Sequence, residues 1–307
     1  MKSKIVVCIN IAIILLIFYF IGDFIKDNIY ELKSIKLNFN YTYLLFSIVF
    51  LISSIFNFSL IWQFITIKNN CQIRLEKGII AWFYSELGKY IPGKVFLLAG
   101  KIYYYKQEGI STKRISFCFF LETVCTLLAA SFIFVISLIF IKNAALEIYK
   151  YYTYLLIPLF VVCLHPRVIE ISVNVIMKAL NKEKVNILVS YLEILEITGL
   201  YVLNFLLLGV SLYFLVSSLY EIEISNYFFL TGSYSLAFLI GIISLFAPSG
   251  IGVREGVLIL ALKHIMPNSI AGIISLVSRV WMTGAELLLI ALVFVYAKAR
   301  GIEFKRC

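Results

Sequence analysis

Long runs of apolar residues constrain this chain more than any other feature of its sequence. A helix needs roughly 20 mostly apolar residues to cross a bilayer at about 1.5 Å per residue. With 62% hydrophobic and 14% charged residues, against about 45–50% and 25% in soluble domains, the chain could not cover its surface in water. The sequence therefore predicts an all-α integral membrane protein, a polytopic helical bundle with 1–307 as one transmembrane domain. About six full crossings are expected, at residues 5–22, 41–67, 115–141, 151–164, 188–220 and 269–297.

Two further apolar stretches, 78–105 and 227–262, are interrupted in the middle. The first contains Tyr90-Ile91-Pro92-Gly93-Lys94, and the second contains Pro248-Ser249-Gly250-Ile251-Gly252. Proline removes a backbone donor and glycine loosens a helix, so each break leaves polar backbone groups without partners. Such groups are tolerated at membrane depth only inside protein or beside a water-filled cavity. We therefore predict two re-entrant helical hairpins; the alternative is a pair of tight turns between ordinary short helices.

The basic residues test this topology. A net charge of +10 would suggest nucleic acid in a soluble protein, but here Lys and Arg cluster between apolar runs. With the N-terminus inside and each hairpin returning to its own side, nineteen of the 27 basic residues are cytoplasmic and seven are outside. That bias is typical of cytoplasmic loops. We expect a multi-pass protein of the cell membrane, with both termini cytoplasmic and no nucleic-acid partner.

The two broken stretches belong to an internal repeat. Pro92 precedes Glu122 by 30 positions, and Pro248 precedes Arg279 by 31. Each unit consists of a long span, a hairpin and a second span, and the linking span 151–164 makes the second unit inverted. Inverted repeats with matching interruptions are common in transporters, where the interruptions mark the substrate site. The predicted units are 41–141, containing hairpin 78–105, and 188–297, containing hairpin 227–262.

Glu122 and Arg279 lie near the middle of apolar runs, where a lone charge costs roughly 2.5–3.5 kcal/mol. Symmetry predicts that both face one central cavity, where they would form a charge pair. A purely structural ion pair that locks the two halves together is the alternative. Glu286 follows Arg279 by about two turns and is expected to line the same cavity. Glu196, on the span that begins near 188, is a weaker candidate for this cavity.

The breaks are also rich in basic residues. Lys89 and Lys94 flank the first, and Arg254 and Glu255 follow the second. Glycine-rich turns and helix N-termini present backbone donors, so these positions suit an anionic headgroup, most naturally a phosphate. Glu255 could instead cap its helix, and Lys101 and Lys106 are expected to snorkel to the cytoplasmic interface. The predicted substrate-binding set is Lys89, Tyr90, Pro92, Gly93, Lys94, Glu122, Pro248, Gly250, Gly252, Arg254, Glu255, Arg279 and Glu286.

Other chemistries lack a sequence signal. The six cysteines form no CxxC pair and the two histidines are far apart, so no metal site is predicted. There is no Walker motif for ATP hydrolysis, and no cofactor is expected. A membrane glycosyltransferase or lipid-modifying transferase would need a carboxylate pair or metal site in an aqueous loop, yet no DxD occurs and the loops are short. We therefore expect that the chain is not an enzyme.

Several motifs together resemble the lysylphosphatidylglycerol synthase transmembrane-region family. They are Leu87 to Val95 (LGKYIPGKV), Glu108-Gly109-Ile110-Ser111, Leu121-Glu122, Pro248 to Gly256 (PSGIGVREG) and Ser278-Arg279. The resemblance spans roughly residues 5–300 and implies a lipid-translocating module. Relatives include the flippase portion of the multiple peptide resistance factors and archaeal proteins implicated in flipping dolichol-linked sugars.

The resemblance has two departures. The family's first signature often carries further glycines after Pro-Gly, where this chain has Lys94-Val95-Phe96. No aminoacyl-transferase domain follows Cys307, so lysyl transfer by this chain alone is not expected. The sequence thus favours a flippase-like transporter for an anionic membrane lipid in cell-envelope biogenesis: a polyisoprenyl phosphate, its sugar-linked form or a phospholipid. The alternative is a non-transporting membrane partner of a cell-envelope glycosyltransferase or lipid-modifying enzyme.

Overall fold

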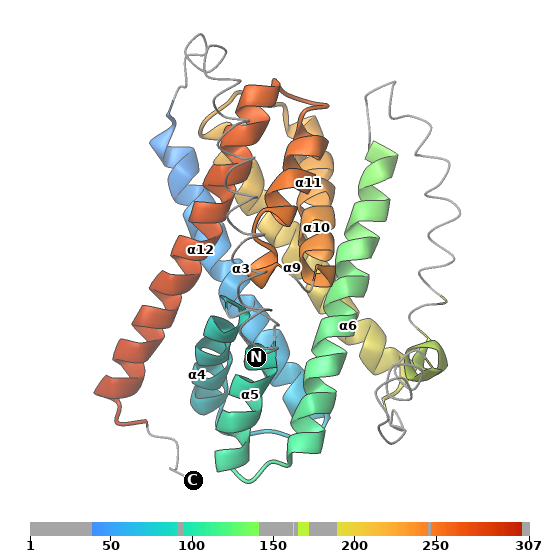
Figure 1. Cartoon of the computed structure of the whole chain (residues 1–307), viewed down its shortest axis with the longest axis vertical. Helices are drawn as coiled ribbons and strands as arrows, with labels where there is room; N and C mark the ends of the chain where they lie inside the picture. Colours follow the sequence, from blue (N-terminus) through green and yellow to red (C-terminus); the bar gives the residue numbers. More distant parts are fainter. Residues whose placement is uncertain are drawn as a thin grey trace, which may run out of the picture.

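The computed structural model describes residues 39–90, 95–140, 162, 165–171, 189–244 and 247–302, and their regular structure is entirely helical (Figure 1). The expected first span 5–22 lies outside these residues, as do both chain ends and Pro92, Gly93 and Lys94. Of the expected linking span 151–164, only Val162 is described.

The first half contains two long helices separated by a short, broken pair. Asn40 begins the first long helix, because its side chain accepts hydrogen bonds from the backbone N–H groups of Thr42 and Tyr43. Ser111 caps the second long helix in the same way. The order is α3 (Tyr41–Lys68), α4 (Leu75–Glu86), η1 (Leu87–Tyr90), α5 (Val95–Gln107), α6 (Thr112–Ser137) and η2 (Leu138–Phe140).

The second half repeats this order of long, broken and long helices. A reciprocal capping box begins α9. The Ser190 hydroxyl accepts a hydrogen bond from the backbone N–H of Glu193, and the Glu193 carboxylate accepts one from the backbone N–H of Ser190. The order is α9 (Tyr191–Ser217), η4 (Ile224–Asn226), α10 (Tyr227–Ile243), η5 (Pro248–Gly250), α11 (Val253–Leu262) and α12 (Asn268–Ala299).

Among the described residues, five helical segments are long and apolar enough to cross a membrane. Four of them, α3, α6 with η2, α9 and α12, coincide with predicted runs. The fifth, Ile224–Ile243, joins η4 to α10 and was expected as the first arm of the second hairpin. Its 20 residues would suffice for a crossing by length. The chain is therefore a multi-pass helical membrane protein.

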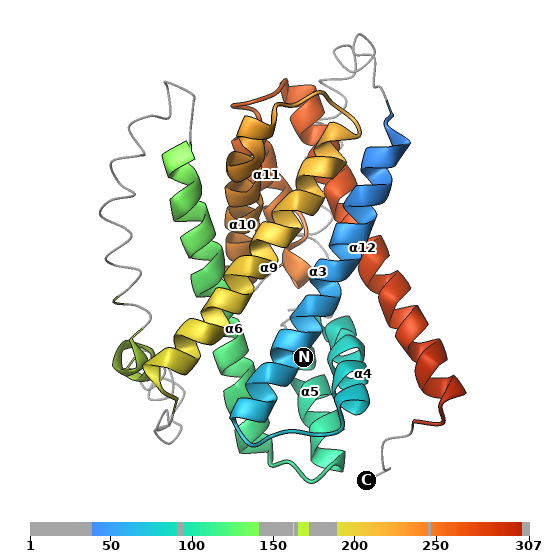
Figure 2. The same ribbon diagram turned by 180° about the vertical axis from the view of Figure 1, so that it is seen from behind.

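The core is centred on α3 and α9, which run antiparallel and lie side by side (Figure 2). Ser47 Oγ donates to the Ser211 carbonyl at 2.8 Å, and Ser211 Oγ donates to the Ser47 carbonyl at 2.5 Å. Farther along, the Asn57 amide donates to Asn204 Oδ1 at 3.0 Å. Small hydroxyl and amide side chains let the two backbones approach and bond to each other across the contact.

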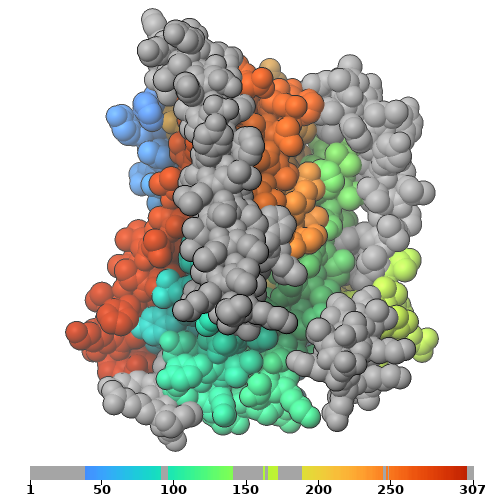
Figure 3. All heavy atoms as spheres, viewed as in Figure 1, coloured from blue at the N-terminus to red at the C-terminus, as the bar shows by residue number. Residues whose placement is uncertain are grey.

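The broken pairs lie at opposite ends of the molecule: α4 packs beside α5, and α10 packs beside α11 (Figures 1 and 3). By length, α4, α5 and α11 extend only about 18, 20 and 15 Å, less than the roughly 30 Å hydrocarbon core. The second helix break falls where proline and glycine predicted it, since η5 is Pro248–Gly250 and α11 starts at Val253; in the first half, α4 gives way to η1 at Leu87. The two breaks meet in the interior, where η1 packs against η5.

The second break depends on glycine. Gly250 and Gly252 have φ of 70° and 81°, a left-handed region that residues with a Cβ rarely adopt. Ser249 shares this conformation with φ of 52°. The turn reverses the chain between α10 and α11 and aims the start of α11 at the interior.

Candidate functional site

A cavity of about 470 Å³ lies where the two halves meet. Its walls come from α3, α4, η1, α5 and α6 of the first half and from α10, η5, α11 and α12 of the second. Much of this lining is apolar, which makes its ionisable members conspicuous. They are Glu86, Lys89, Glu122, Arg254 and Glu286.

One wall holds two carboxylates around a single lysine, a cluster of Glu86, Lys89 and Glu286 that we call the acidic triad. Lys89 Nζ lies 2.5 Å from Glu286 Oε1 and 3.1 Å from Glu86 Oε2. The Tyr90 hydroxyl donates to the other Glu286 oxygen at 2.7 Å. The triad joins η1 of the first half to α12 of the second. Its formal charge is −1.

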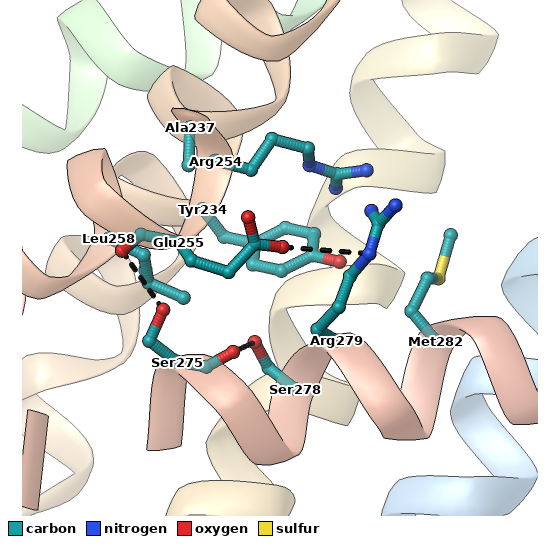
Figure 4. Close-up of a pocket in the computed structure, with 9 residues that line it drawn as sticks. All are labelled: Tyr234, Ala237, Arg254, Glu255, Leu258, Ser275, Ser278, Arg279 and Met282. Atoms are coloured by element: carbon teal, nitrogen blue, oxygen red, sulfur yellow. Dashed lines mark hydrogen bonds and ion pairs between the residues drawn. The ribbon is translucent and has the colours of Figure 1, made fainter. Parts of the chain in front are cut away.

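A second part of the lining is Arg254, which lies near another arginine and one carboxylate. Figure 4 shows the guanidinium groups of Arg254 and Arg279 pointing toward each other, beside a small pocket of about 10 Å³. Arg279 Nε lies 3.5 Å from Glu255 Oε1, and Arg279 Nη1 donates to the Ser249 carbonyl at 3.2 Å. Within the described part of the chain, no carboxylate comes within ion-pair distance of Arg254. This group, Arg254, Arg279 and Glu255, is the arginine cluster, and its formal charge is +1.

Arg254 is held by packing. Its guanidinium carbon lies 5.4 Å from the centre of the Tyr234 ring and 5.0 Å from that of Phe238. These cation–π contacts orient the charge without neutralising it. Glycine makes room for the side chain, because a Cβ on Gly241 would come within 2.3 Å of Arg254 Cγ and one on Gly250 within 3.0 Å of Cδ. The site thus presents an oriented cation to the cavity.

The third group of charged residues is the ion pair of Lys101 and Glu122, which we call the closed pair because its two charges balance each other. Lys101 on α5 bonds Glu122 on α6, and the Trp82 indole N–H donates to Glu122 at 3.3 Å. The Lys101 ammonium also lies 3.8 Å from the centre of the Trp62 ring, and the lysine is 0% exposed. The prediction that Lys101 snorkels to the interface is wrong, because these aromatic and acidic partners satisfy its charge inside the protein.

Two further expectations about pairing are also wrong. Glu122 and Arg279 do not pair with each other, because each has a nearer partner on the short helix of its own half. Glu196, considered for the cavity, pairs instead with Lys68 at 3.0 Å, and its side chain is 52% exposed.

The remaining predicted residues fall into three groups. Lys89, Glu122, Arg254 and Glu286 line the cavity itself, and Glu255 and Arg279 line the adjoining small pocket. Tyr90 reaches the site through Glu286, and Gly250 and Gly252 shape the turn beneath Arg254. Glu255 accepts a bond from the Gly252 N–H, as the capping alternative predicted, and also pairs with Arg279. The last group lies outside the described part of the structure; it consists of Pro92, Gly93, Lys94 and the side chain of Pro248.

Sequence reasoning missed Glu86, Lys101 and Trp82. Glu86 lies one helical turn before Lys89, a spacing that could have indicated an ion pair. For Lys101 and Trp82 the spacing carries no signal, since their shared partner Glu122 belongs to another helix. Among the described residues, no group of His, Cys, Asp or Glu is arranged to hold a metal ion.

The fold and the site together define a polytopic helical membrane protein with a charged internal cavity. More specifically, the chain belongs to the lysylphosphatidylglycerol synthase TM region family, whose profile matches residues 7–292. This match confirms the resemblance expected from the two signatures. None of the curated proteins matches the chain.

Proposed function

We propose that this chain is a flippase-like transporter that moves an anionic membrane lipid between leaflets. The observation that carries the proposal is the arginine cluster, in which Arg254 lines the cavity and faces Arg279, with the single carboxylate of Glu255 beside them. A phosphate is the natural ligand for guanidinium groups, because their planar donors match its oxygens. Membership of the lysylphosphatidylglycerol synthase TM region family is consistent with a lipid-related role.

We propose that the two halves are inverted repeats built around this cavity. An offset of 156, the interval from Pro92 to Pro248, converts α4 into 231–242, α5 into 251–263 and α6 with η2 into 268–296. These ranges nearly coincide with α10, α11 and α12. The helices of each half also pack in the same pairs, such as α5 with α6 and α11 with α12.

The lining of the cavity follows the same offset. At four pairs of positions that the offset relates, both residues line the cavity. A cavity on the axis that relates two halves is where transporters with inverted repeats bind their substrates. The pairs are Trp82 with Phe238, Glu86 with Ile242, Leu98 with Arg254, and Thr126 with Met282.

In this proposal the two broken pairs are re-entrant hairpins that enter from opposite membrane faces. Their opposite ends in Figure 1 and the short lengths of α4, α5 and α11 favour that arrangement. The bias of basic residues favours a cytoplasmic first hairpin and cytoplasmic termini. The phosphate would bind at the arginine cluster while the acyl or isoprenyl tails stay in lipid. Candidate lipids are a polyisoprenyl phosphate, its sugar-linked form and a phospholipid.

Reconstitution tests the proposal. Purified protein in proteoliposomes should increase the rate at which acyl-labelled fluorescent phosphatidylglycerol crosses the bilayer, measured by chemical quenching of the outer leaflet. Arg254→Gln and Arg279→Gln should each reduce that rate toward the protein-free background. Arg300→Gln, at the exposed end of α12, is the matched control and should behave as the unchanged protein.

Two results would contradict the proposal: vesicles with protein that match empty vesicles, or an Arg254→Gln rate equal to that of the control. Absence of lipid movement together with a stably co-purifying envelope enzyme would favour the non-transporting partner. Phosphatidylcholine, whose headgroup carries no net charge, serves as the comparison lipid.

A further inference from the structure

We propose that binding of the lipid phosphate is coupled to uptake of one proton by Glu86. This inference rests on the proposed function and adds to it an ion that moves with the lipid. It is built on the acidic triad, which the phosphate site does not use.

The charges around the cavity are separated in space. The Lys101–Glu122 pair is closed, so two unbalanced groups remain among the described residues: the arginine cluster at +1 and the acidic triad at −1. The charges of the two groups balance each other across the cavity. A phosphodiester bound to the arginine cluster adds one negative charge, and the acidic triad is then left without a counter-charge. In a cavity with mostly apolar walls this is costly.

A proton on the triad restores the balance. It would come from cavity water and bind a carboxylate oxygen, and it would return to water when the lipid leaves. No covalent bond to the lipid is made or broken. The result is electroneutral co-binding of a singly charged headgroup and one proton.

Glu86 is the better of the two candidate acceptors. Glu286 accepts two short bonds, from Lys89 at 2.5 Å and from the Tyr90 hydroxyl at 2.7 Å, so its charge is well satisfied. Among the described residues, the ion-pair partner of Glu86 is Lys89 alone, at the longer distance of 3.1 Å. Its side chain is also more open than that of Glu286, with 14% exposed against 9%. A proton on Glu86 would leave Lys89 fully paired with Glu286.

The repeat gives an independent reason to regard the triad as functional. Under the offset of 156, Glu86 corresponds to Ile242 and Glu286 to Ala130. Ile242 lines the same cavity, so an apolar residue fits at that place in the fold. The fold alone therefore does not require a carboxylate at position 86.

The other ionisable groups around the triad are accounted for element by element. On α5 and α6, Lys101 and Glu122 satisfy each other. On α11 and α12, Glu255 is engaged by Arg279. Tyr90 on η1 already donates to Glu286, and Tyr234 on α10 lies against Arg254. Of the described acids that line the cavity or the adjoining small pocket, Glu86 has the fewest partners.

Calorimetry of the purified full chain in detergent tests this inference. The probe is dihexanoylphosphatidylglycerol, a soluble diester whose single charge does not change between pH 6 and 8. Titrations in buffers of different ionisation enthalpy should report uptake of about one proton per bound lipid. Glu86→Gln should bind the probe with no proton uptake. Glu76→Gln, an exposed acid on the same helix that pairs with Arg74, is the matched control and should retain the uptake.

A second measurement needs no variant. The dissociation constant of the unchanged protein should rise with pH, by up to about tenfold per pH unit, the slope of a one-proton linkage. Binding whose heat and affinity depend neither on buffer nor on pH overturns the inference and leaves the proposed function standing. Proton uptake that persists in Glu86→Gln overturns the assignment to Glu86. Absence of any binding overturns the inference together with the proposed function.

Discussion

The two broken pairs of helices occupy equivalent places in their halves, yet their chemistry is opposite. Beside α4 and η1, two carboxylates pair with one lysine; beside α11, one carboxylate pairs with one of two neighbouring arginines. The ion pair between the short and the long helix also has opposite polarity in the two halves. In Lys101–Glu122 the cation is on the short helix α5, whereas in Glu255–Arg279 the anion is on the short helix α11. A similar backbone arrangement thus supports opposite charge. The helices define the cavity, and the side chains alone give it a positive and a negative wall.

Reversing the positive wall should have the largest effect on lipid binding. Arg254→Glu places a carboxylate where the phosphate would bind and leaves it facing Tyr234 and Phe238. Loss of a buried charge contact costs about 2–5 kcal/mol, so lipid binding should weaken about 30-fold or more. Calorimetry with the short-chain probe measures it. An Arg254→Glu protein that binds as tightly as the unchanged chain would remove the distinction between the two walls.

Breaking the closed pair of the first half should mainly affect stability. Lys101→Met leaves Glu122 charged and buried, which should destabilise the protein by about 3–5 kcal/mol. Adding Glu122→Gln should recover part of this loss, because no uncompensated charge then remains. The thermal unfolding midpoint in detergent is the measurement. A double variant less stable than Lys101→Met would show that the charge of Glu122 is not balanced by Lys101.

Crowding Arg254 should have an intermediate effect on lipid binding and on stability. Gly241→Ala puts a methyl group about where Arg254 Cγ lies, so the guanidinium must leave its stacked position. Overpacking of this kind costs about 1–3 kcal/mol. Lipid binding should weaken while Gly199→Ala, where a Cβ meets no atom, should change neither binding nor the unfolding midpoint. Equal behaviour of the two variants would count against the packing of Arg254.

The smallest effect is expected outside the cavity. Glu196→Gln breaks the Lys68–Glu196 pair, in which both side chains are substantially exposed. Such pairs contribute about 0–1 kcal/mol, so the unfolding midpoint and lipid binding should hardly change. A strong loss of lipid binding would restore Glu196 as a candidate for the site.

The sequence predicted the helices better than it predicted the contacts between them. Apolar length fixes α3, α6, α9 and α12, and Pro248 with its glycines fixes the break before α11, since these signals are local. The ion pairs Lys101–Glu122 and Glu255–Arg279 are not local, because each joins residues of two different helices. Symmetry suggested Glu122 with Arg279, but the side chain of Lys101 reaches Glu122 from the neighbouring short helix. Glu86 was missed because its role depends on Glu286, two hundred positions later in the chain.

The packing of α3 against α9 limits how the molecule can open. Polar contacts join the two helices at both ends and between them. They are Asn40 with Ser218, Ser47 with Ser211, Asn57 with Asn204, and Lys68 with Glu196. Two rods fastened at both ends and in between move together as one rigid beam. Any change that widens the interior must therefore come from the other helices moving against this beam, because α3 and α9 cannot separate without breaking these contacts.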